Sequence, residues 1–123
     1  MGEFYWRVGV WSADGERIET VDALVDTGAS YSLFPRSMLE RLGIAKRFVL
    51  PFEQADGSVI DRDVGLAMLV INDTQSSMRV IFGEDDAESL IGSNALQEFL
   101  LLVDPVAEEL VPRTGRLKFN GSG

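Results

Sequence analysis

The residues around Asp26 are the first candidates for chemistry in this chain. Asp26 follows an apolar run over residues 23–25, and Gly28 comes two residues later. Glycine tolerates positive φ, so the chain can turn sharply directly after the apolar run. Burying a carboxylate costs several kcal/mol unless hydrogen bonds or a shared proton relieve it. Asp26 is therefore a candidate catalytic group, and the alternative is an aspartate that only caps a turn.

The composition narrows the chemistry that Asp26 could perform. The sequence of 123 residues contains no cysteine and no histidine. Thiolate catalysis, disulfides, Cys- or His-ligated metals and nucleophiles activated by a histidine base are thereby excluded. Acid–base catalysis would have to use Asp, Glu, Lys or Tyr. Two carboxyl groups that share one proton can both activate water and protonate a leaving amine, so carboxylate chemistry is the route that the composition favours.

The charge of the chain indicates which partners to expect. The formal net charge is −9, and the 11 basic residues are scattered. Phosphate binding needs clustered Lys and Arg, so we expect no nucleic acid partner. The longest apolar run, residues 99–103, is far too short to span a bilayer, and no secretory signal pattern is visible. We expect a soluble cytoplasmic protein without a membrane partner.

An acidic segment over residues 84–88 is the one place where a metal site is conceivable. Its spacing matches no EF-hand pattern, so we favour a solvated loop over a calcium or magnesium site. We expect no metal and no cofactor.

Strand patterns dominate the segments that must position Asp26. Apolar and β-branched runs predict strands, and Asp-Gly or Asn-Asp pairs predict the turns between them at residues 14–15, 56–57 and 72–73. A short helix is expected over residues 35–42, with Pro35 at its first position, and a second helix is expected to open at Ser93 or Asn94. Strands are predicted over residues 4–11, 17–25, 48–55, from 59, 67–71, 78–82, 89–92, 99–104, 109–111 and 117–119. We expect one mainly β domain over residues 1–119 and a flexible tail over residues 120–123.

Three features in a fixed order point to a known family. Asp26-Thr27-Gly28-Ala29 ends an apolar strand, and Leu90-Ile91-Gly92 follows much later, with Asn94 and a helix behind it. A hairpin with an Asp-Gly tip lies between the two. This order resembles the single-lobed, retropepsin-like aspartic proteases, and the helix over residues 35–42 resembles that of cellular and bacterial members. The resemblance implies a closed β-barrel of the acid-protease type with one or two short helices.

The resemblance also implies a role for each part of the site. Asp26 would be catalytic, Thr27 would hydrogen-bond across a dimer, Gly28 would let substrate backbone approach, and Ala29 would line the cleft. Supporting positions around the turn would be Leu90, Ile91, Gly92 and Asn94. The hairpin would be a flap that closes over substrate, although an ordinary surface hairpin is the alternative. Its substrate-binding residues would be Gln54, Ala55, Asp56, Gly57 and Ser58.

The single copy of Asp-Thr-Gly predicts the assembly. Asn72-Asp73-Thr74 lacks the glycine, so a working carboxylate pair requires two chains, and we expect a symmetric homodimer. The expected function is an aspartic endopeptidase that hydrolyses peptide or protein substrates. The alternative is a catalytically silent peptide-binding or dimerisation module on the same fold. Ser30 and Ser93 replace the Asp and Arg that form an ion pair near the dimer interface of viral relatives, so that pair is not expected here.

Overall fold

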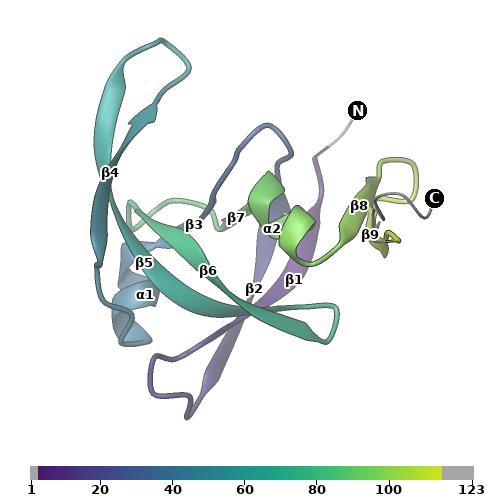
Figure 1. Ribbon diagram of the computed structural model, residues 1–123, viewed down its shortest axis with the longest axis horizontal. Helices are drawn as coiled ribbons and strands as arrows, with labels where there is room; N and C mark the ends of the chain where they lie inside the picture. Colours follow the sequence, from purple (N-terminus) through teal and green to yellow (C-terminus); the bar gives the residue numbers. More distant parts are fainter. Residues whose placement is uncertain (1–2, 115–123) are drawn as a thin grey trace, which may run out of the picture.

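The computed structural model describes residues 3–114, and Figure 1 shows them as a strand-rich fold with two short helices. The expected mainly β fold class is confirmed. In chain order the elements are β1 (Tyr5–Trp11), β2 (Ile18–Val25), β3 (Ser32–Pro35), α1 (Arg36–Arg41), β4 (Phe48–Glu53), β5 (Val59–Ile71), β6 (Thr74–Gly83), β7 (Leu90–Ile91), α2 (Ser93–Glu98), β8 (Leu101–Asp104) and β9 (Glu109–Pro112). The strand expected over residues 117–119 and the tail over residues 120–123 lie outside the described residues.

The main sheet curls back on itself. Its seven strands follow the order β1-β2-β7-β3-β6-β5-β4, and β1 also pairs with β5. This additional pairing, at Gly9↔Val70 and Val10↔Leu69, joins six of the strands into a ring. β4 extends the sheet beyond β5, and the β4–β5 hairpin rises away from the ring (Figure 1). β8 and β9 form a separate two-stranded sheet.

The ring encloses the hydrophobic core. Alternate residues of a strand face the same side, so Val8 and Val10 of β1 point inward together. Phe34, Phe82 and Ile91 meet them from β3, β6 and β7, and all five side chains are fully or almost fully buried. Burying side chains of this size stabilises the fold by about 1.5–3 kcal/mol each. The strands around Asp26 therefore rest on a well-packed interior.

The position of β7 determines where the Asp26 turn must run. β7 lies between β2 and β3, parallel to β2 at Leu24↔Leu90 and antiparallel to β3 at Leu33↔Leu90. The chain that leaves β2 must therefore cross the end of β7 before it can enter β3. Asp26 lies at the start of this crossing.

α2 begins at Ser93, as expected, whereas α1 begins one residue later than expected, and the caps of both helices differ from the prediction. Pro35 is the last residue of β3 and precedes the first residue of α1, with an extended ψ of 139°. Gly92, and neither Ser93 nor Asn94, occupies the N-cap position of α2, and neither helix has a capping side chain at that position. Both helices obtain partners for their first amides from distant parts of the chain.

The acidic segment supplies the partner for α1. The backbone N–H of Ser37 donates to Asp85 Oδ1 at 3.0 Å, so this carboxylate satisfies one of the free amides at the start of the helix. Glu84 of the same segment forms an ion pair with Arg62 at 3.4 Å. Part of the segment that we expected to be a solvated loop thus fixes α1 and β5.

The strand expected over residues 67–71 and the strand that returns from the hairpin are one continuous strand, β5. Gly65 lets β5 pass close to the backbone at Ala45, because a Cβ at this position would lie only 2.7 Å from the carbonyl oxygen of Ala45.

None of the helices in the described part of the chain is long and apolar enough to cross a membrane.

Candidate active site

Backbone hydrogen bonds fix the Asp26 turn at both ends. The N–H of Asp26 donates to the carbonyl oxygen of Ile91 at 3.0 Å, and the N–H of Ala29 donates back to that of Asp26 at 3.2 Å. The N–H of Gly28 donates to Asp26 Oδ1 at 2.9 Å, which orients the carboxylate. Asp26 is half-buried, whereas Thr27 and Gly28 are exposed. The turn therefore presents one oriented carboxylate at the surface of the ring.

Gly92 allows the turn to lie directly on the end of β7. A Cβ at Gly92 would lie 2.7 Å from the carbonyl oxygen of Tyr31 and 2.8 Å from those of Ala29 and Ser30. Such distances are far shorter than a carbon–oxygen contact allows, so a side chain at this position would displace the turn.

The first amides of α2 bind the same turn. The N–H of Ser93 donates to the carbonyl oxygen of Ala29 at 2.7 Å, and the N–H of Asn94 donates to that of Ser30 at 3.0 Å. These bonds satisfy the start of α2 without a capping side chain. Behind them, the N–H of Gly92 donates to the buried hydroxyl of Ser32 at 3.2 Å. The predicted supporting residues Gly92 and Asn94 thus hold the turn through their backbone.

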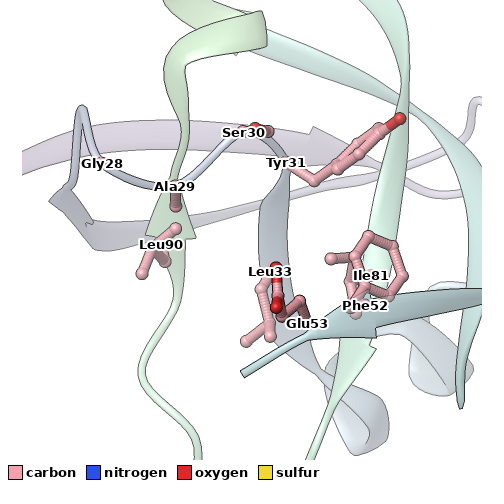
Figure 2. Close-up of a pocket in the computed structure, with 9 residues that line it drawn as sticks. All are labelled: Gly28, Ala29, Ser30, Tyr31, Leu33, Phe52, Glu53, Ile81 and Leu90. Carbon is pink, nitrogen blue, oxygen red and sulfur yellow. The ribbon is translucent and has the colours of Figure 1, made fainter. Parts of the chain in front are cut away.

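An open cleft of about 400 Å³ runs beside the turn, between β3, β4, β6 and β7 (Figure 2). Its walls are largely apolar, and the ring of Tyr31 packs edge-on against Phe52 with 5.5 Å between ring centroids. The carboxylate of Glu53 is the charged group in this lining. The lining residues are Gly28, Ala29, Ser30, Tyr31, Leu33, Phe52, Glu53, Ile81 and Leu90.

A sequence comparison identifies the family. The model of the family described as "gag-polyprotein putative aspartyl protease" matches residues 15–98, which is more than half of the chain and includes the Asp26 turn, the β4–β5 hairpin and β7. The chain belongs to this aspartic protease family. No curated protein sequence matches the chain.

Solved structures show the same retropepsin fold. A retropepsin-like aspartic protease from Rickettsia conorii has a TM-score of 0.58 at 21% identity, over 84% of this chain and 77% of that chain. The EIAV protease in complex with the inhibitor HBY-793 has a TM-score of 0.58 at 16% identity, over 89% and 93% of the two chains. The retroviral protease-like domain of Ddi1 from Leishmania major has a TM-score of 0.59 at 16% identity, over 91% and 89%.

The structure brings most of the retropepsin-like motif together. Gly28, Ala29 and Leu90 line the cleft, whereas Asp26 and Thr27 lie beside it and are not part of its lining. Ile91 is fully buried behind the turn. Asn94 lies on a second hollow of about 280 Å³ with Tyr31, Ser32, Met78 and Arg79. Tyr31 therefore lines two hollows next to the Asp26 turn.

The expected flap residues lie away from the cleft. All five residues from Gln54 to Ser58 are exposed, and none of them lines the cleft. The tip is a well-formed turn: Gly57 has a φ of 88°, and the hydroxyl of Ser58 donates to Asp56 Oδ1 at 2.6 Å. This hydrogen bond holds the pKa of Asp56 below its ordinary value. The hairpin reaches the cleft through Phe52 and Glu53, at the end of β4.

Several cleft residues were not singled out from the sequence. Tyr31 and Leu33 line the cleft from the segment that leads into β3 and from β3 itself, Glu53 from β4 and Ile81 from β6. Tyr31 and Leu33 are two positions apart, so the strand period would have placed them on one side. The sequence contains no comparable signal for Glu53 and Ile81, because their approach to the turn depends on the curl of the whole sheet. Among residues 3–114, no cluster of three or more metal-ligating side chains is present.

Proposed function

We propose that the chain is an aspartic endopeptidase in which two copies of Asp26, one from each protomer of a homodimer, activate a water molecule. The observation that carries the proposal is the half-complete site. Among residues 3–114, the Asp26 carboxylate accepts one hydrogen bond, from the N–H of Gly28, and no second carboxyl group bonds to it. Its surroundings fix its orientation without supplying the acid that peptide hydrolysis also needs.

A second copy of the chain would supply that acid. Two carboxyl groups in contact do not both stay ionised, so an apposed pair holds one proton between them. The ionised member takes a proton from water as the water attacks the scissile carbonyl. The protonated member donates to the carbonyl oxygen, and the tetrahedral intermediate collapses when the amine leaves with a proton. A two-fold axis beside Asp26 places both groups in equivalent surroundings.

The sheet offers a way to hold an extended peptide next to this pair. β4 pairs with β5 along one side only in the described chain, so its other side is a free edge. An extended peptide can add to such an edge by backbone hydrogen bonds and place alternate side chains in pockets. The apolar cleft beneath Phe52 would accept one of these side chains. The net charge of −9 also favours peptides over nucleic acids as partners.

A silent peptide-binding or dimerisation module is the second candidate, and the position of the hairpin supports it. The residues from Gln54 to Ser58 leave the cleft uncovered, so this arrangement would bind a peptide without enclosing it. Closing the hairpin is the step that the enzyme requires and the module does not.

Replacement of the carboxylate distinguishes the two candidates. The wild type, Asp26→Asn and the control Asp73→Asn would be incubated with denatured casein and with an apolar peptide library, at pH from about 4 to 7. Asp73 is a matched control because it also precedes a threonine but lies in an exposed turn. We expect Asp26→Asn to lower the cleavage rate by about a thousandfold or more, and Asp73→Asn to leave it unchanged. Identical products from wild type and Asp26→Asn, or no cleavage at any concentration, would refute the enzyme.

A further inference from the structure

We propose that Glu53 makes the cleft select a peptide side chain with an apolar stem and a positively charged end, that is, lysine or arginine. This inference rests on the proposed peptidase function and narrows its substrate class. It departs from the apolar preference that the cleft walls alone would suggest.

The lining of the cleft combines apolar walls with a single charge. Leu33, Phe52, Ile81 and Leu90 surround most of the hollow, and Glu53 brings a carboxylate to it from the end of β4 (Figure 2). Lysine and arginine bury their methylene stems on apolar surface while their charged ends stay near water or near an opposite charge. The cleft provides both kinds of surface within one hollow.

The charge of Glu53 is not neutralised by its own chain. In the described part of the protein, no lysine or arginine forms an ion pair with Glu53, whereas Arg62 pairs with Glu84 at 3.4 Å. The hairpin segment over residues 52–61 contains Glu53, Asp56 and Asp61 and no basic residue. The negative potential over the hairpin therefore remains available for a cation from the substrate.

Arg79, the basic residue that lines the second hollow, does not neutralise the charge of Glu53. Arg79 of β6 stacks over the ring of Phe48 at 4.7 Å and lines the second hollow, beyond Tyr31. It is not part of the Glu53 cleft. The two hollows thus carry opposite charges, and Tyr31 lines both of them.

The expected preference is moderate because Glu53 is exposed in the free protein. Exposed ion pairs contribute little, and a peptide that covers the cleft would strengthen the pair by excluding water. We therefore expect a preference of about five- to tenfold for lysine over norleucine, which has a similar apolar stem and no charge.

The test uses peptides that differ at one position, which carries lysine, norleucine or glutamate and is moved along the sequence. The ratio of kcat/KM between the lysine and norleucine peptides would be measured for wild type, Glu53→Gln and Glu53→Lys. Asp61→Asn is the matched control, because it removes a negative charge from the same hairpin without altering the cleft lining. We expect Glu53→Gln to abolish the preference, Glu53→Lys to reverse it towards glutamate, and Asp61→Asn to retain it.

The outcome separates this inference from the proposed function. Cleavage that depends on Asp26 but shows the same lysine-to-norleucine ratio in wild type and Glu53→Gln would overturn the role of Glu53 alone. Absence of any cleavage would overturn the peptidase. In that case, the dissociation constants of the same peptides would be measured by fluorescence anisotropy. A lysine preference in binding that Glu53→Gln removes would support the inference, and equal binding of all peptides would overturn it.

Discussion

At the scale of single residues, the position of Asp26 depends on a glycine in a distant part of the chain. Gly92 has three carbonyl oxygens of the Asp26 turn against it, all within 2.8 Å of where a Cβ would stand. The N–H of Asp26 also bonds to Ile91, the residue before this glycine. The turn and the end of β7 therefore behave as one unit, and a methyl group between them would move the carboxylate.

Gly92→Ala is predicted to remove activity together with part of the stability. The added methyl group must push the turn away from β7, which we expect to cost about 1–3 kcal/mol in the free energy of unfolding. Urea unfolding and the rate of peptide cleavage would measure the two effects. Gly92 has an ordinary negative φ of −96°, so crowding alone opposes its substitution. Gly15→Ala is the control for destabilisation without crowding: its φ is 73° and no atom lies within 4 Å of its Cβ position, so we expect it to lose stability and keep its activity. A Gly92→Ala variant with normal activity would contradict the proposed coupling.

The sequence was informative at this scale where a motif fixes the backbone. Asp26 is indicated by its place between an apolar run and a turn glycine, and Gly92 by the resemblance to the retropepsin-like proteases; the close contact of Gly92 with the turn is seen only in the structure. Tyr31 and Glu53 were not identified as cleft residues. Their role depends on side chains that meet across β3 and β4, which no local pattern encodes.

At the scale of elements, an ion pair at the last turn of α1 joins this helix to β2 of the ring. Arg41 donates to both carboxylate oxygens of Glu19 on β2, at 2.7 and 3.0 Å. Arg17 adds a hydrogen bond to the carbonyl oxygen of Arg41. The hydrogen bonds from Arg41 hold the pKa of Glu19 below its ordinary value of 4.5.

This shift predicts how stability depends on pH. Because the pKa of Glu19 is lower in the folded chain, the ion pair stabilises the fold fully above pH 4.5, and the stabilisation is lost as the pH falls through the folded-state pKa. The pair is partly exposed, so Glu19→Gln should lower the free energy of unfolding at pH 7 by at most about 1 kcal/mol. The difference from wild type should shrink below pH 4.5.

Denaturant unfolding between neutral and acidic pH would measure this difference. Glu109→Gln on β9 is the control, since Glu109 is exposed and forms no ion pair within the described part of the chain. A constant gap between wild type and Glu19→Gln at every pH would contradict the assignment of the effect to this carboxylate.

Elements were predicted well where the pattern is local and poorly where a partner is distant. The first two strands and the turns at residues 14–15, 56–57 and 72–73 follow from alternation and turn residues. The helices lie close to where they were expected, but their capping partners do not follow from the sequence: Asp85 caps α1 from another loop, and the carbonyl oxygens of Ala29 and Ser30 accept from α2. These partners are visible only once the sheet has curled.

At the scale of the whole molecule, the proposed homodimer needs exposed apolar surface, and one such area lies on the β8–β9 side. The β8–β9 hairpin stands outside the main sheet and exposes Leu100, Leu102 and Val106, with 45%, 49% and 93% of their surface accessible. Figure 1 shows this hairpin beside α2 and β1, near both ends of the described chain. Phe4 does not contribute to this surface because it is buried in the core. Among residues 3–114, these three side chains are one of several exposed apolar areas, and the proposed homodimer would need to cover such an area.

The homodimer is the central claim, and mixing active with inactive chains tests it most directly. Wild-type chain would be held at a fixed concentration at which the rate per chain no longer rises with concentration, so that nearly all chains are paired, with substrate in large excess, and Asp26→Asn chain would be added and allowed to exchange partners. If each active site needs Asp26 from two copies, random pairing with about a ninefold excess leaves about a tenth of the wild-type chains with a wild-type partner. We predict that the cleavage rate falls to about that level. A rate that stays unchanged as Asp26→Asn is added would show that one copy of Asp26 suffices, and would contradict the paired site.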